Sequence, residues 1–305
     1  MRLSTTNFEK ARRFIKTQAR ALDRSLFEHH FEGASAGAVL TELARYQNED
    51  GGFGRSLEPD FRLEASSPLA TSVAFQMLRE LAAPADHPLA RNGIAYFLKT
   101  FDGVRGGWQA APQAVNAVPH APWWTFDEAE GKVSPETPAN PSAEIAGYLY
   151  AYAELVPPDF LAAVTGRVIK HLEANHGAMA MFDLHCYRRM AGELPQPQQD
   201  QVLALLRPAI ANLVERDPAA WAGYVAQPLE FVKSPDSPYY SSLREATEAN
   251  LDYAIQTQAE DGSWPPKWSW GDSYPDIWPT ARQEWAGVLT VETLRILEAF
   301  DRIDR

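Results

Sequence analysis

The chain has 305 residues, of which 45% are hydrophobic, and a formal net charge of -12 at pH 7. That length suits one large domain or two small ones with a substantial core. The acidic balance argues against nucleic acid as a partner, because phosphate contacts need clustered Lys and Arg. The one cysteine, Cys186, excludes an internal disulfide and fits a reducing compartment.

The N-terminal stretch carries recurrent charges in place of the apolar core of a signal peptide. No stretch approaches the roughly 20 apolar residues that a membrane span needs. We therefore predict a cytoplasmic protein without an integral membrane segment. The oligomeric state does not follow from the sequence.

Helical periodicity dominates the chain, and strand signals are nearly absent. Residues 36–47 and 160–172 each carry a single apolar stripe, which is typical of a helix with one wet face. Residues 68–81, 145–155 and 286–297 are apolar almost all round, which predicts helices that are covered on every face. The simplest arrangement is a ring of inner helices enclosed by a ring of outer ones.

A short motif recurs where predicted outer helices end. Gln47-Asn-Glu-Asp-Gly-Gly-Phe53 returns as Gln258-Ala-Glu-Asp-Gly-Ser-Trp264, and Gly106-Gly-Trp108 is a weaker copy. Glycine supplies the positive φ that ends a helix, and Asp favours turns through its own backbone bonds. We interpret the motif as a turn from an outer to an inner helix, with the aromatic residue as an anchor.

These motifs resemble the repeats of terpenoid cyclases and protein prenyltransferases, including the QW motif of squalene-hopene cyclases. The resemblance implies an all-α fold, an α/α toroid of two concentric helical barrels with about five to six helical hairpins, as a single domain over 1–305. It also implies a small apolar ligand of isoprenoid type in a central cavity.

The catalytic signatures of those families are missing from this chain. The D-x-D-D motif of class II terpenoid cyclases is absent, and the acids at 58–60 and 272–276 do not match it. Asp183, His185 and Cys186 have the wrong spacing for the zinc site of prenyltransferases, and a helix with a buried Cys explains them more simply. We predict no cofactor and no metal, although the sequence leaves zinc binding by those side chains open.

If inner helices alternate with outer ones, the inner helices run parallel and their N-termini share one end of the ring. The loops 55–67, 109–140 and 265–278 then meet at that end. The candidate catalytic acids in these loops are Asp60, Glu58 and Asp276, and the candidate ligand contacts are Trp123, Trp124, Trp268, Trp270, Tyr274, Arg62 and His120.

This mixture of aromatic rings and acids has two chemical interpretations. Aromatic walls stabilise a carbocation, and Asp60 or Asp276 could protonate an alkene or epoxide, as in a cyclase. Aromatic rings beside paired carboxylates also suit sugars, and Glu58 or Asp60 with Asp276 would then be the pair of a carbohydrate-active enzyme, a glycoside hydrolase or lyase. A third possibility is a non-catalytic binding protein that keeps the fold without the chemistry.

Overall fold

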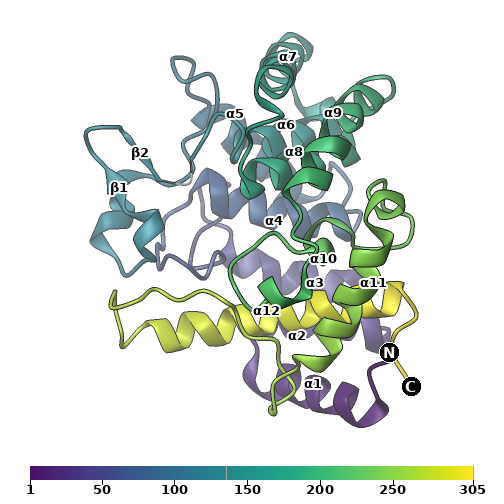
Figure 1. The fold of residues 1–305 in the computed structure, drawn as a ribbon. Helices are drawn as coiled ribbons and strands as arrows, with labels where there is room; N and C mark the ends of the chain where they lie inside the picture. Colours follow the sequence, from purple (N-terminus) through teal and green to yellow (C-terminus); the bar gives the residue numbers. More distant parts are fainter. Residues whose placement is uncertain (135, 305) are drawn as a thin grey trace. The chain divides into compact units, whose positions relative to one another are not determined.

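The computed structural model describes residues 1–134 and 136–304. The described chain is predominantly helical, which confirms the all-α prediction (Figure 1). Its α-helices are α1 (Thr5–Gln18), α2 (Ala21–Glu32), α3 (Ala36–Leu43), α4 (Pro68–Glu80), α5 (Pro88–Thr100), α6 (Ser142–Ala151), α7 (Pro158–Asn175), α8 (Met181–Glu193), α9 (Gln198–Leu213), α10 (Pro228–Phe231), α11 (Tyr240–Gln256) and α12 (Trp278–Ala299). Among the described residues, the helices lack the length and apolar character that crossing a bilayer requires.

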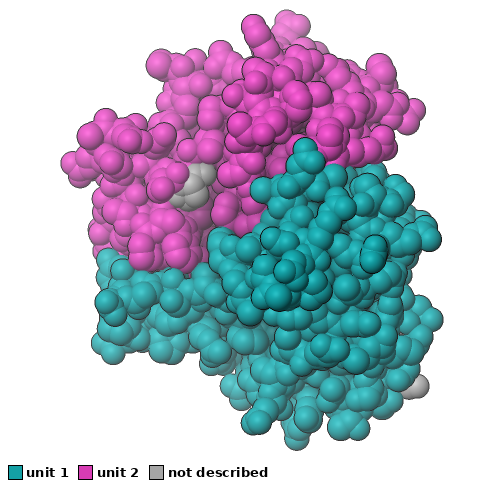
Figure 2. Space-filling model, viewed as in Figure 1, with its two compact units in different colours: residues 1–42, 210–305 teal, residues 43–209 magenta. Residues whose placement is uncertain are grey.

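The chain forms two compact units (Figure 2). Unit 1 comprises residues 1–42 and 210–305, and unit 2 comprises residues 43–209. The single domain over 1–305 therefore stays a prediction.

In unit 2, α6 is the most enclosed helix. Every residue from 142 to 149 is buried, and α6 packs against α4, α7 and α8. The predicted helix over 145–155 is thus confirmed in type, but it starts earlier and gives way to a 3₁₀ turn at Ala153–Leu155. The glycine at 147 explains the close approach to α8, because a Cβ there would lie 2.7 Å from the Met190 Cα.

Helix α4 begins as the sequence predicts. Ser67 is the N-cap, its hydroxyl accepts the backbone N–H of Ala70 at 3.0 Å, and Pro68 is the first helical residue. Asn140-Pro141 has the same pairing of a capping residue with proline, but α6 begins at Ser142 and has no side-chain cap.

The long loop 109–140 contains a short hairpin that the sequence analysis did not predict. Strands β1 (Phe126–Asp127) and β2 (Lys132–Val133) pair antiparallel. The Asp127 carboxylate accepts the backbone N–H groups of Ala129 and Glu130 at 2.8 and 3.1 Å, and Gly131 has φ 67°. These features stabilise the turn and not the strands. Each strand has only two residues, which is too short for an alternation of apolar and polar residues to be recognised.

The motif beginning at Gln47 is a turn, as predicted. The Gln47 side-chain amide donates to the carbonyls of Gly51 (3.0 Å) and Leu89 (3.1 Å), the latter at the start of α5. The Phe53 backbone N–H donates to the hydroxyl of Thr71 on α4 at 2.9 Å. Gly51 has φ 88°, and a Cβ there would lie 2.5 Å from the backbone of α5. The turn therefore fastens α5 to α4.

The copy at Gln258, in unit 1, has the same bonds. Its amide donates to the carbonyls of Gly262 (2.9 Å) and Asn7 (3.0 Å), the latter in α1. The Trp264 backbone N–H donates to the hydroxyl of Thr290 on α12 at 3.0 Å, and Gly262 has φ 94°. The two motifs are therefore equivalent in geometry as well as in sequence.

The weaker copy keeps only part of this pattern. Gly106 has φ 74°, and the Trp108 backbone N–H donates to the hydroxyl of Ser142 at the start of α6, at 3.0 Å. The Trp108 indole N–H also donates to the Phe97 carbonyl at 2.8 Å, so its ring is fixed beneath the loop. The aromatic residue is an anchor in each of these three turns.

In unit 1, α12 packs against α1 and α2, and the two ends of the chain lie side by side (Figure 1). Leu3 and Ile303 form a parallel bridge, and the Leu3 N–H donates to the Arg302 carbonyl at 2.7 Å. Arg302 also forms an ion pair with Asp252 of α11 at 3.0 Å. First and last segments are thus joined within one unit.

Candidate functional site

The loops that precede α4 and α6 meet within unit 2. The Ala121 N–H donates to the Asp60 carbonyl at 2.7 Å, and the Arg62 N–H donates to the Pro119 carbonyl at 2.9 Å. These two bonds join loop 55–67 to loop 109–140. The segment that carries Asp60 is therefore fixed by backbone hydrogen bonds to loop 109–140.

Both candidate acids of this loop are buried. The exposed fraction is 4% for Asp60 and 8% for Glu58. Acidic side chains are seldom fully buried, because removing a carboxylate from water costs free energy. Glu58 and Asp60 are both buried within three residues of one loop. A turn that only reverses the chain at the surface would not require this, so the loop is a candidate functional segment. Arg62, in the same loop, is half-buried.

His120 is fixed beside this loop. It is buried and forms an isolated antiparallel bridge with Phe61. Its Nδ1 lies 2.6 Å from the Val118 carbonyl oxygen, and its Nε2 lies 3.1 Å from the hydroxyl of Thr125. Because a carbonyl only accepts, Nδ1 carries a proton, and the ring orientation is set by the second loop.

Aromatic rings line the same region of unit 2. Trp124 is buried, and its ring lies 5.5 Å from the Phe61 ring in an edge-to-face arrangement. Its indole N–H has no hydrogen-bond partner among the described residues. Trp123, the preceding residue in the same 3₁₀ turn, is half-buried. The acids Glu58 and Asp60 thus share their loop junction with apolar rings.

The third loop, 265–278, lies in unit 1 and is rich in packed aromatic rings. Trp270 is 1% exposed, and its ring centroid lies 5.6 Å from that of Trp278 and 6.5 Å from that of Tyr274. The ring centroid of Trp268 lies 5.1 Å from that of Trp285 on α12. The Tyr274 backbone has φ 47°, which a residue with a Cβ seldom adopts.

Asp276, the remaining candidate acid, differs from Asp60. It is exposed, as are Tyr274 and Pro275 before it. An exposed carboxylate keeps its hydration, whereas a ligand enclosed in a cavity meets side chains that are buried. Of the candidate acids, the buried pair Glu58 and Asp60 has the environment that acid chemistry favours.

Unit 1 also holds an acid that no sequence motif marks. Burial raises the pKa of Glu230, in the short helix α10, to about 7. Lys267 lies nearby; its amine donates to the Trp221 carbonyl at 2.6 Å and lies 5.0 Å from the centre of the Tyr253 ring. Although the Lys267 residue as a whole is exposed, desolvation of its amine lowers its pKa. One signal in the sequence was available: Glu230 is a single charge inside the apolar stretch 228–232.

The side chains considered for zinc have other roles. Asp183 accepts the Thr137 hydroxyl at 2.5 Å, and the Cys186 sulfur lies 3.6 Å from the Asn140 side-chain oxygen. Within residues 1–134 and 136–304, no group of three or more His, Cys, Asp or Glu side chains could hold a metal ion. The simpler interpretation of Cys186, a small buried residue, fits this geometry.

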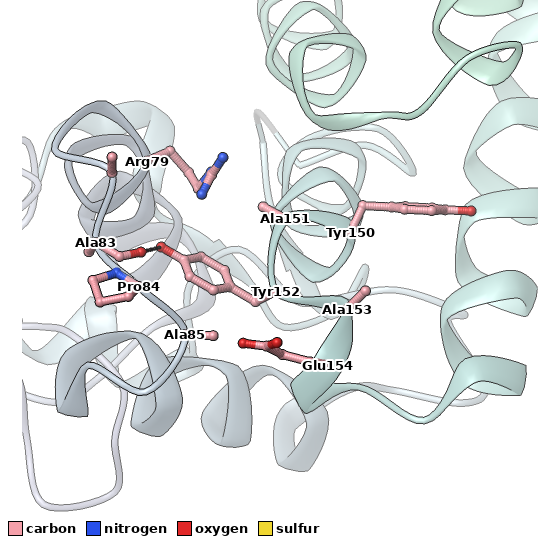
Figure 3. A pocket seen from close by; sticks show the side chains of 10 residues that line it. Arg79, Ala83, Pro84, Ala85, Tyr150, Ala151, Tyr152, Ala153 and Glu154 are labelled. Atoms are coloured by element: carbon pink, nitrogen blue, oxygen red, sulfur yellow. Dashed lines mark hydrogen bonds between the residues drawn. The ribbon is translucent and has the colours of Figure 1, made fainter.

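A pocket of about 420 Å³ opens at the other end of α4 and α6 (Figure 3). Figure 3 shows Tyr152 reaching across it to donate to the Ala83 carbonyl at 3.1 Å, with the Arg79 guanidinium 5.3 Å from the Tyr152 ring centre. Since the C-terminal ends of α4 and α6 line one pocket, these two helices run parallel, as the sequence analysis expected. The acid loop lies at their N-terminal ends.

No family model and no curated protein matches this sequence. Solved structures of the type II terpene cyclase MstE from Scytonema do match its fold. A single-residue variant in complex with geranylgeranyl dihydroxybenzoate has a TM-score of 0.54 at 10% identity, covering 97% of each chain. Another variant, in complex with the product merosterolic acid A, gives 0.55 at 10% identity and the same coverage. The ligand-free protein gives 0.52 at 12% identity, over 95% of this chain and 97% of that one. The chain therefore has a terpenoid-cyclase-like fold.

Proposed function

We propose that this chain is a terpenoid-cyclase-like enzyme on an α/α toroid, which binds an apolar ligand of isoprenoid type and protonates it with Asp60. The fold is similar to that of a cyclase whose structures contain an isoprenoid substrate and its product. The observation that carries the proposal is the buried Asp60 carboxylate, 4% exposed, in a loop braced against aromatic side chains. Glu58, buried two residues earlier, is the second acid of this site.

The chemistry requires a carboxylic acid and rings that face a cation. Asp60 transfers its proton to a terminal alkene carbon, so that a C–H bond forms from the alkene π pair and the neighbouring carbon becomes a cation. Internal alkenes then attack in turn, and each attack forms a C–C bond and moves the cation along the chain. Loss of a proton from the final cation restores the acid, so the reaction is an isomerisation and needs no co-reactant.

Aromatic side chains have a defined role in this reaction. The face of an indole or phenol ring attracts a cation at a distance of about 6 Å or less. We assign this role to Trp123 and Trp124, which lie in the same unit as Asp60. Arg62 and His120 are assigned to ligand positioning, because both belong to the loop junction that holds Asp60.

The carbohydrate alternative has less support. It needs a second carboxylate across the scissile bond from Glu58 or Asp60, and Asp276 was the candidate. Asp276 is exposed, in a loop whose neighbouring residues are also exposed. The two buried acids Glu58 and Asp60 lie so close in sequence that they suit one acid centre better than two opposed groups.

Incubation with geranylgeranyl dihydroxybenzoate and with geranylgeraniol, followed by mass spectrometry, tests the proposal. We expect cyclised isomers of unchanged mass, and Asp60→Asn should lower the rate by about 10²- to 10⁴-fold. Asp159→Asn, an exposed acid on α7, is the matched control and should leave the rate unchanged. Release of sugars from an oligosaccharide panel would support the carbohydrate alternative. Tight isoprenoid binding by the wild type without any turnover would identify a non-catalytic binding protein.

A further inference from the structure

A second polar centre lies inside unit 2, on helices rather than loops. Glu144, in the first turn of α6, is 3% exposed. Its carboxylate accepts the Arg189 guanidinium of α8 at 2.7 Å, and the Gln76 side-chain amide of α4 lies 3.5 Å from its other oxygen. Three helices thus contribute one side chain each to this centre.

The geometry of this centre is held by close helix packing. Glu144 and Arg189 lie on α6 and α8, which contact each other more extensively than any other two helices of the described chain. The absence of a side chain at Gly147 permits this approach, because a Cβ would meet the backbone of Met190 at 2.7 Å. The ion pair therefore joins two rigid elements, and binding a ligand there would order few further groups.

Arg189 has hydrogen-bonding capacity that the protein does not use. A guanidinium carries five N–H donors, and the described residues accept one hydrogen bond from Arg189, through Glu144. About 30% of its side chain is exposed. Although burial opposes its charge, the nearby Glu144 carboxylate raises the pKa of Arg189, so the guanidinium stays cationic. The planar guanidinium of Arg189 is thus charged, has N–H donors that no described residue accepts, and belongs to a partly exposed side chain.

Tyr148 adds an independent sign of a missing partner. It lies one turn after Glu144 on the same face of α6, and its side chain is 2% exposed. Its hydroxyl has no hydrogen-bond partner among the described residues. Burial and then the Glu144 charge raise the pKa of Tyr148, so the hydroxyl remains a donor. A buried donor without an acceptor is rare, because it costs about 1–3 kcal/mol.

Two other groups near this centre offer Arg189 no acceptor. Arg79 and Glu193 form an ion pair at 3.0 Å, one turn further along α8 from Arg189. The Cys186 thiol is buried, and burial raises its pKa, so it carries no charge. The unused donors of Arg189 thus call for an acceptor from outside the protein. A carboxylate fits best, because its two oxygens match the planar guanidinium fork.

We propose that Arg189, oriented by Glu144 and flanked by Gln76 and Tyr148, binds the carboxylate of a small acid with an apolar body. Arg189 and Gln76 meet the carboxylate, since the Tyr148 oxygen is fully enclosed and reaches the ligand only after a side-chain shift. The apolar body rests on the proposed function, whereas the carboxylate site rests on these side chains alone.

Isothermal titration with farnesoic acid and its neutral twin farnesol tests the proposal. We expect the wild type to bind the acid about 10- to 100-fold more tightly, the range that one charge-assisted hydrogen-bonded pair provides. Arg189→Lys keeps the charge but loses the fork, so it should remove most of this preference. Arg207→Lys, an exposed arginine on α9, is the matched control and should keep it.

Two further measurements keep the outcomes distinct. Gln76→Ala, which removes the second donor assigned to the carboxylate, serves if Arg189→Lys fails to fold, and it should weaken acid binding several-fold. Decanoate and benzoate are titrated as acids without an isoprenoid chain. Binding of these acids in an Arg189-dependent way, with no binding of farnesol, would support the carboxylate site while contradicting the isoprenoid function. Equal affinity of the wild type for farnesoic acid and farnesol, or an unchanged preference in Arg189→Lys, overturns the proposal.

Discussion

Thr71 and Phe53 are joined by a buried hydrogen bond in which the Phe53 backbone N–H donates to the Thr71 hydroxyl at 2.9 Å. The same hydroxyl donates to the Ser67 carbonyl at 2.8 Å, within the first turn of α4. One side chain therefore joins the end of the turn at 47–53 to α4, the helix that follows. The corresponding bond from Trp264 to Thr290 does the same in unit 1.

We predict that Thr71→Val destabilises the protein by about 1–3 kcal/mol, because the shape is kept while the Phe53 N–H loses its acceptor in a fully buried place. Thr71→Ser keeps the hydroxyl and should cost less than about 1.5 kcal/mol. Urea unfolding followed by circular dichroism measures both. Equal stability of Thr71→Val and wild type would show that this bond does not hold the loop.

A second prediction concerns Glu230, whose pKa burial raises to about 7 from an ordinary value of 4.5. The folded state then binds this proton more tightly than the unfolded state. The contribution of this group to the free energy of unfolding is therefore fully present below the ordinary pKa of 4.5, and it is lost as the pH rises through about 7. Lys233 and Lys267 oppose the shift, and Glu292 adds to it.

Glu230→Gln should remove this decline and stabilise the protein at pH 8 by about 1–3 kcal/mol, which the size of the shift allows. Melting temperatures between pH 5 and 8 provide the measurement. Glu245→Gln, an exposed acid on α11, is the control and should follow the wild type. A wild-type curve that rises from pH 5 to 8 as steeply as that of Glu230→Gln would contradict the raised pKa.

A third prediction concerns the thiol of Cys186, which is 3% exposed and whose pKa is raised by burial and then by Glu144. Thiolate is the reactive form, so a thiol reagent at pH 8 should modify the folded protein at least about 100-fold more slowly than the urea-unfolded chain. Added Zn²⁺ should leave the melting temperature unchanged. Rapid modification of the folded protein, or a rise in melting temperature with zinc, would restore the metal hypothesis.

Helix type was predictable where the sequence pattern reflects burial. Residues 68–81 and 286–297 are apolar on most faces; α4 covers the first stretch except its last residue, and α12 contains the second. Ser67 and Pro68 fixed the start of α4 because a cap and a first-turn proline are local devices. The start of α6 was less predictable, since Asn140 is occupied elsewhere, close to the Cys186 sulfur.

Part of the candidate site was likewise predictable from the sequence, and part was not. The meeting of loops 55–67 and 109–140 was predicted from the expectation that the helices after them run parallel. The same expectation placed loop 265–278 beside them, and that part stays a prediction. The centre at Glu144 and Arg189 could not be predicted, because these residues are 45 positions apart and only helix packing brings them together. Glu230 was missed because its pKa depends on the burial of a short helix that carries no motif.

The bridge between Leu3 and Ile303 brings the first and last segments of the chain together, so the fold of unit 1 does not require the chain to be open at this point. A peptide linker could join the two ends across a short gap, and the chain could be cut instead at Val104, which is fully exposed in the turn before Trp108. Such a circular permutant would keep every helix contact within unit 1. In this sense the packing of unit 1 depends on which segments meet and not on which of them comes first along the chain.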